Sequence, residues 1–179
     1  TWEIITRYLE DRDPYRKIKV FYNEKLLALV PALRRQIAEA PDPFSAALKM
    51  AVAANLIDFA ATAAIDDQLL LYRLKQARTE VFAVDDSQSL YCQLGPARSL
   101  LYLGDNCGEI VVDKLFIEQI KKEFPRLQVY FGVRGQAIVN DVTLADAAMI
   151  KMEQVATVID NGDGSLGTVM ERTSEQFKQ

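Results

Sequence analysis

The sequence contains no histidine among its 179 residues. This absence excludes Ser-His-Asp and Cys-His catalysis within the chain, and zinc sites that depend on imidazole ligands. Its two cysteines, Cys92 and Cys107, form neither a disulfide framework nor a Cys-x-x-Cys pair, which indicates a reducing compartment. A metal site in this chain would therefore use carboxylate and amide oxygens, which are the ligands that Mg²⁺, Mn²⁺ and similar hard ions prefer.

Concentrated positive charge is also lacking. The net charge is −4 and no Lys/Arg-rich block occurs, so we expect no nucleic-acid partner. Lys49, Asn55 and Asp58 interrupt the Ala-rich stretch 46–65, and each would be costly in hydrocarbon, so this stretch is interpreted as a buried helix and not as a membrane span. The chain opens without a basic-then-apolar leader, and we expect a cytoplasmic protein without a membrane partner.

The hydrophobic pattern changes near residue 80. Residues 1–80 are predicted to be helical, with helices after Pro14 (kinked or divided at Pro31), from Asp42-Pro43 and over 67–79. Residues 81–179 alternate strands with helices: strands at 81–84, 99–103, 127–132 and 155–159, and helices at 87–94, at about 109–123 and from Thr143. The sequence thus predicts an α/β fold, a Rossmann-like three-layer sandwich. Its parallel-sheet core, covered on both faces, is preceded by an α-helical N-terminal portion that contributes to the site.

A candidate metal site follows the predicted strand 99–103. Asp105 and Asn106 offer a carboxylate and an amide oxygen, and Gly104 and Gly108 allow a tight turn before the helix. In open α/β sheets, ligands bind at the carboxyl ends of strands, and a helix N-terminus attracts phosphate. The alternative is that Asp105 or Asn106 only caps the helix that starts at Glu109.

A second group of polar residues follows the predicted strand 127–132. Arg134 could reach a phosphate with its planar guanidinium, and Asp141 could supply a further metal ligand. Two alternatives remain open: Arg134 is a solvated loop residue, or Asp141 forms an Asx-turn ahead of the next helix. Thr143 and Asp146 have capping-box spacing and already fill the capping role, which weakens the alternative for Asp141.

Other polar residues give weaker signals. Asn55 falls on one helix face with Phe44, Leu48 and Ala51, and Asp58 lies one turn further, so buried Asn55 and Asp58 either satisfy backbone groups or bind a ligand. The loop 160–168 resembles a calcium loop in composition, but its glycines occupy ligand positions, and the Gly-Lys-Ser/Thr ending of a P-loop is missing. Cys107 is a packed loop residue or a thiol without an evident base.

Together these motifs resemble the metal-dependent damage-control phosphatases, long catalogued as a domain of unknown function and also described as carbohydrate or metabolite phosphatases with an ARMT-like metal-binding domain. The similar segments span about two thirds of the chain. They are Asn55–Phe59, Asp105–Ile110, Arg134-Gly135, Ile138–Thr143 with Asp146, and Asn161-Gly162.

The resemblance implies a divalent cation (Mg, Mn, Co or Ni) on Asp105, Asn106 and Asp141, with Asp105 and Asp141 as the catalytic residues. It also implies hydrolysis of phosphate monoesters on sugar phosphates or damaged phosphometabolites, in a pocket lined by Asn55, Asp58, Glu109, Arg134 and Asn140. Members of the family begin well upstream, often with a Cys-x-x-Cys pair, and continue into a Gly-rich segment whose lysine contacts the phosphate. This sequence has no counterpart of either, and we expect a piece of a longer protein.

The predicted mechanism uses the metal to polarise the phosphoryl group, while Arg134 and the helix N-terminus at Gly108 offset charge. Water is favoured over aspartate as the nucleophile, because Asp105-Asn106-Cys107 does not fit the Asp-x-Asp pattern of haloacid-dehalogenase-type enzymes. Two alternatives remain. One is an adenosylmethionine-dependent carboxyl methyltransferase, which would need a better Gly-rich loop. The other is a metal- and phosphate-binding module without turnover.

Overall fold

The structure is a computed structural model that describes residues 2–56, 66–77 and 79–178. Asp58 lies outside these ranges. Helices come first and a sheet follows, in the order α1 (Trp2–Tyr8), α2 (Arg16–Ala38), α3 (Pro43–Asn55), α4 (Asp67–Ala77), α5 (Ser87–Leu94), β1 (Ser99–Leu103), α6 (Glu109–Glu123), β2 (Gln128–Val133), α7 (Leu144–Met149), the 3-10 helix η1 (Met152–Gln154), β3 (Thr157–Asp160), the 3-10 helix η2 (Met170–Arg172) and α8 (Glu175–Lys178). None of the described helices combines the length and the apolar character that a membrane crossing requires.

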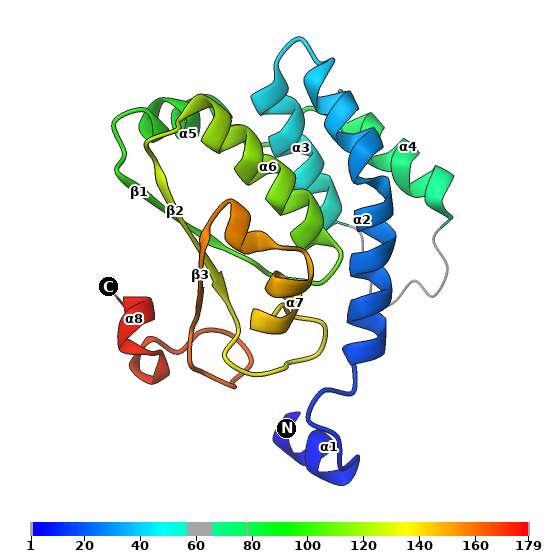
Figure 1. Cartoon of the computed structure of the whole chain (residues 1–179), viewed down its shortest axis with the longest axis vertical. Helices are drawn as coiled ribbons and strands as arrows, with labels where there is room; N and C mark the ends of the chain where they lie inside the picture. The colour runs from blue at the N-terminus through cyan, green and yellow to red at the C-terminus, as the bar shows by residue number, and fades with distance from the viewer. Residues whose placement is uncertain (1, 57–65, 78, 179) are drawn as a thin grey trace.

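The three strands form one parallel sheet in the order β1-β2-β3. Leu103 pairs with Gly132 and Val133 pairs with Asp160, so the carboxyl ends of all three strands meet at one edge. The mixed α/β class and the parallel sheet are therefore confirmed. Because β1 and β2 are joined through α6, and β2 and β3 through α7 and η1, the loops that follow the strands gather at this edge (Figure 1).

Helix α6 is the centre of the packing. It is buried on nearly all sides between Glu109 and Ile120, because the sheet lies on one side of it and α2 and α3 lie on the other (Figure 1). One cluster of buried residues joins Leu33 of α2 and Met50 of α3 to Phe131 of β2. The core thus crosses residue 80, and the division of the chain at that point stays a prediction.

The two faces of the sheet differ. Val129, Phe131 and Val133 point toward α6 and are buried. On the opposite face, Leu103 is 61% exposed, and Leu101 and Tyr130 are also exposed, while α8 lies beside β3 at the carboxyl edge (Figure 1). In the described part of the chain the long helices cover one face only, so the predicted covering of both faces is not observed.

Three local predictions are wrong, each because packing overrides a sequence pattern. Helix α2 continues through Pro31 because Leu26, Leu29, Leu33 and Ile37 pack into the core on both sides of this exposed proline. Residues 81–84 form a loop and not a strand: Val81 is 90% exposed, and Lys49 Nζ donates to the Glu80 carbonyl 2.7 Å away. Asn55 is exposed at the end of α3, whose buried face runs through Ala47, Ala51 and Ala54.

A buried carboxyl lies between the sheet and α6. The Tyr102 hydroxyl donates to Asp113 Oδ1 across 2.7 Å, and the Tyr102 ring stacks on Phe131. Burial raises the pKa of Asp113 to about 8 from the usual 3.8, and the Tyr102 hydrogen bond opposes this effect. Below about pH 8, Asp113 is therefore mostly protonated in the folded protein.

This shift predicts how stability depends on pH. The folded protein holds the Asp113 proton more tightly than the unfolded chain, so the free energy of unfolding falls as pH rises from about 4 to about 8, by at most about 1.4 kcal/mol per pH unit. The Asp113→Asn variant keeps an acceptor for the Tyr102 hydroxyl and cannot ionise. Its free energy of unfolding should therefore fall less between pH 5 and pH 8 than that of the wild type. Urea unfolding at both pH values measures this, and parallel pH dependences of the two proteins would contradict it.

Candidate functional site

Two loops pair through their backbones at the carboxyl edge of the sheet. The Val142 N–H donates to the Asp105 carbonyl at 2.8 Å, and the Cys107 N–H donates to the Asn140 carbonyl at 2.9 Å. Asn106 and Asp141 are the opposed residues of this antiparallel bridge. The two hydrogen bonds flank the pair, which makes it the closer, non-hydrogen-bonded type, with both side chains on the same side of the backbone. The fold thus brings together two of the predicted metal ligands.

Helix capping does not explain these residues. The residue that precedes α6 is Gly108, and no side chain caps this helix. The capping box of α7 is made by Thr143 and Asp146, so Asp141 is not needed there. Both capping alternatives for Asp105, Asn106 and Asp141 are therefore wrong.

The donor set suits a hard divalent cation. Asp105 is exposed, and Asn106 and Asp141 are half-buried. Within the described ranges no three Asp, Glu, His or Cys side chains are grouped closely enough to hold a metal, so a cation here would use two carboxylates and the Asn106 amide oxygen. Mg²⁺ is commonly held by one or two carboxylates together with water and substrate phosphate, and these residues fit that pattern.

Arg134 is fixed at the same edge and is not a solvated loop residue. Its Nε donates to Asp141 Oδ2 at 2.7 Å, and its Nη1 donates to the Gly167 carbonyl at 2.7 Å and to Thr168 Oγ1 at 3.2 Å. Burial raises the pKa of Asp141, and the hydrogen bond and positive charge of Arg134 counteract this. The guanidinium is thereby held beside a predicted metal ligand, where it could meet a phosphate.

Glu109 supports the metal-ligand loop from the first turn of α6. It is only 3% exposed, and its Oε1 accepts the Asn106 N–H at 2.8 Å while its Oε2 accepts Asn55 Nδ2 at 3.1 Å. Burial raises the pKa of Glu109, and the nearby Asp105 carboxylate also raises it. Asn55 thus reaches the site through Glu109, although it is not buried as predicted. Asn140 contributes its backbone carbonyl to the loop pairing described above.

A third loop, after β3, closes the edge. Asn161 Oδ1 accepts the Gly135 N–H at 2.8 Å and the Asp163 N–H at 3.0 Å. A Cβ on Gly135 would lie only 2.7 Å from the Gly162 backbone, so the two loops touch main chain to main chain. Asn161 was predicted only as part of a motif. Its position directly after a strand, like that of Asp105, was the signal that could have placed it in the site.

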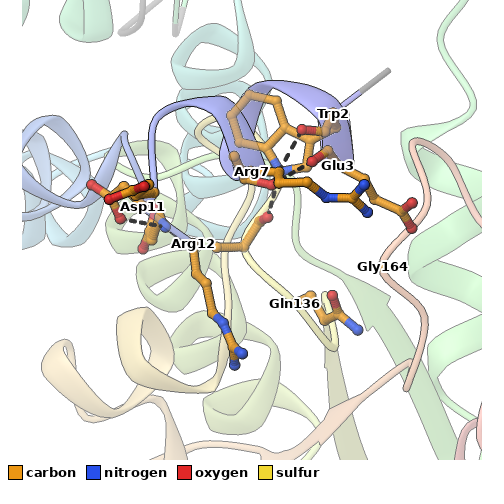
Figure 2. Close-up of a pocket in the computed structure, with 11 residues that line it drawn as sticks. Trp2, Glu3, Arg7, Asp11, Arg12, Gln136 and Gly164 are labelled. Atoms are coloured by element: carbon orange, nitrogen blue, oxygen red, sulfur yellow. Dashed lines mark hydrogen bonds between the residues drawn. The ribbon is translucent and has the colours of Figure 1, made fainter.

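A pocket of about 190 Å³ lies between these loops. Asp105, Arg134, Asn161 and Thr168 line it, together with Leu103 of β1, Gly132 of β2 and Phe177 of α8. A larger cleft of about 900 Å³ lies between α1 and the loops after β2 and β3, and none of the predicted site residues lines it. Figure 2 shows this cleft, with Trp2 and Arg7 of α1 facing Gln136 and Gly164. We place the candidate site at the smaller pocket because Asp105, a predicted metal ligand, and Arg134, a predicted phosphate-binding residue, line it.

Comparison with known proteins gives the family of this chain. The family model described as the damage-control phosphatase ARMT1-like domain matches residues 2–179. Similar proteins are the damage-control phosphatase PH1575 of Pyrococcus horikoshii (27% identical, 97% of this chain and 58% of that protein) and a damage-control phosphatase of Archaeoglobus fulgidus (26%, 93% and 57%). An uncharacterized protein of Methanocaldococcus jannaschii, MJ0202, is 30% identical over 97% of this chain and 59% of its own length.

A solved structure is also similar. The crystal structure of the DUF89 family protein PH1575 from Pyrococcus horikoshii superposes with a TM-score of 0.86 at 26% sequence identity, over 97% of this chain and 59% of that chain. The chain therefore spans less than two thirds of the length of the relatives that it matches.

The contact between Gly135 and Gly162 gives a test of the loop packing. Gly135→Ala places a methyl group against backbone that cannot rotate away, and we expect it to lower the free energy of unfolding by about 1–3 kcal/mol. Gly95→Ala is the matched control, because the nearest atom to its Cβ would be the Cys92 carbonyl oxygen at 3.5 Å, an ordinary contact. Denaturant unfolding compares the two variants, and equal stabilities would show that the loops separate without cost.

Proposed function

Because the chain belongs to the damage-control phosphatase ARMT1-like domain family, we propose that it contains the metal- and phosphate-binding centre of a divalent-metal-dependent phosphatase. Its substrates would be phosphate monoesters of small metabolites, such as sugar phosphates or damaged phosphometabolites. The observation that supports this proposal most strongly is the pairing of Asn106 with Asp141 beside the fixed guanidinium of Arg134.

Asp105, Asn106 and Asp141 would hold the cation, with Mg, Mn, Co or Ni as candidates. When bound, the cation would polarise the phosphoryl group and partly neutralise its charge. Arg134 would donate hydrogen bonds to phosphoryl oxygens, because Asp141 and Gly167 already fix the direction of its guanidinium. The first turn of α6, after Gly108, would add backbone N–H groups.

Hydrolysis would use water as the nucleophile. Water would attack phosphorus, and the bond between phosphorus and the ester oxygen would break. One proton of the water would pass to a carboxylate, and the leaving alkoxide would take a proton from that carboxylic acid or from solvent. Asp105 and Asp141 are the candidate catalytic carboxylates. Asn55, Glu109 and Asn140, and Asp58 outside the described ranges, would border the substrate.

Two features of the fold also enter the proposal. The sheet would belong to a Rossmann-like three-layer sandwich. Residues 1–80 would form an α-helical portion that contributes to the site, and residues 81–179 would form the Rossmann-like metal- and phosphate-binding portion. A second candidate function is a metal- and phosphate-binding module without turnover. The exposed sheet face beside the pocket favours this candidate, because Leu103, which lines the pocket, is 61% exposed to water.

An assay with a generic phosphate monoester tests the proposal. Hydrolysis with Mg²⁺, Mn²⁺, Co²⁺ or Ni²⁺ should exceed hydrolysis without metal, and Asp105→Ala should lower kcat/KM by about 100-fold or more because it removes a charged metal ligand. Asp86→Ala is the matched control, since this exposed aspartate precedes α5 and makes no side-chain capping hydrogen bond.

The same variants separate the two candidate functions. A metal-dependent rise in melting temperature that Asp105→Ala abolishes, without turnover in the wild type, would support the binding module. If metal affects neither turnover nor melting temperature, the phosphatase proposal is wrong for this chain.

A further inference from the structure

Two polar side chains of α2 are buried where this helix passes the metal-ligand loops. Lys19 is 2% exposed and Asn23 is fully buried, and they lie one helical turn apart on the same face. Buried amide and ammonium groups are costly unless they are hydrogen-bonded or paired. Their partners therefore indicate what this face of α2 stabilises.

Asn23 binds the loop that carries Asp105 and Asn106. Its Oδ1 accepts the Gly108 N–H at 2.7 Å. Gly108 has φ +84°, a conformation that side chains disfavour, so this residue is the sharp corner between the loop and α6. The Asn23 amide also lies 3.9 Å from Met149 Sδ of α7, the helix that follows the second loop.

Lys19 binds the element that follows Asp141. Its Nζ lies 3.1 Å from Asp146 Oδ2 and 3.0 Å from Asp13 Oδ2. The same Asp146 oxygen accepts the Thr143 N–H at 2.9 Å and the Thr143 hydroxyl at 2.8 Å, which is the capping box of α7. Lys19 thus fixes the start of α7, two residues after the metal-ligand carboxylate.

We infer that Lys19 and Asn23 are positioning residues, which hold the two metal-ligand loops at the separation that a shared cation requires. The inference rests on the proposed function, because it concerns the affinity of that same site. One helix face reaches both loops: Asn23 fixes Gly108 at the end of the first, and Lys19 fixes Asp146 beyond the second. Because α2 is a single continuous helix of 23 residues, it relates the two loops rigidly.

The pairing of the loops with each other does not make α2 redundant. Two backbone hydrogen bonds join the loops beyond the ends of the strands, and the Arg134 N–H ties the second loop to the end of β2 by donating to the Val142 carbonyl at 2.9 Å. None of these bonds involves Gly108, the corner at which the first loop enters α6. Residues that orient metal ligands without touching the metal commonly change metal affinity by about 10- to 100-fold when they are replaced. If the two backbone bonds were sufficient, replacing Asn23 would lower stability and leave affinity unchanged.

Lys19 also joins two segments of the chain. The carboxylates that face its Nζ are Asp13 from the segment before α2 and Asp146 from α7. The buried ammonium is therefore held from both sides, and it fixes the start of α7 relative to α2.

Metal titration of Asn23 variants tests the inference. Asn23→Leu has a similar size and removes the acceptor for Gly108, and we expect it to weaken Mn²⁺ binding about 10- to 100-fold in calorimetric titration. Asn23→Asp retains an acceptor oxygen and should keep the affinity within about threefold of the wild type. The matched control is Leu33→Ala, which opens a cavity in the same helix far from the loops and should lower the melting temperature without changing Mn²⁺ affinity.

Lys19→Met gives a second measurement, with the same expected loss of affinity. This variant leaves Asp13 and Asp146 without their cation, and the Asn23 variants decide if it is not recovered folded. If the wild type binds Mn²⁺ and Asn23→Leu binds it equally well, the inference is overturned while the proposed function stands. If the wild type binds no divalent cation, the proposed function fails and the inference fails with it.

Discussion

The backbone pairing of Asn106 with Asp141 is the contact on which the candidate site depends. It joins the loop after β1 to the segment before α7 and sets a carboxylate and an amide oxygen side by side. The Asp105 carboxylate is also close enough to raise the pKa of Asp141, so positive charges nearby stabilise the arrangement. Arg134 supplies one from the end of β2, and Lys19 supplies another from α2. The positive charges and the loop pairing therefore form one structural unit.

Burial of the acidic residues of α6 lowers the stability of the protein, and the loop contacts explain the burial of only one of them. Glu109 and Asp113 lie one turn apart on a buried helix, and burial raises the pKa of both. Glu109 accepts hydrogen bonds from the Asn106 backbone and the Asn55 amide, so its burial holds the metal-ligand loop. Asp113 binds only Tyr102 among the described residues, and we have no account of its function. Buried acids of this kind are common at functional sites, where the geometry that the function requires lowers the local stability.

Sequence patterns predicted the parts of the fold that short-range physics determines. The strand at 99–103, the helix at 109–123 and the capping box of Thr143 and Asp146 were predicted correctly, because apolar runs and caps are local signals. The strand at 81–84 was wrong because a strand needs a neighbour, which no local pattern supplies. Lys19 and Asn23 were missed for a related reason: polar residues on a helix usually face solvent, and only the packing of α2 against α6 and α7 buries them.

The two parts of the candidate site, the loops that carry the predicted metal ligands and the pocket beside them, are associated with opposite faces of the sheet. The metal-ligand loops are held from the helix-covered side, through Asn23 of α2 and Glu109 of α6. The pocket beside them opens toward the other face, where Leu103, Gly132 and Phe177 line it. Changes on α2 should therefore alter the affinity for a cation with little effect on the shape of the pocket. Changes at Leu103 or Phe177 should instead alter the shape of the pocket and leave the loop contacts of α2 intact. In the proposed site, residues that set metal affinity and residues that shape the pocket are therefore separate.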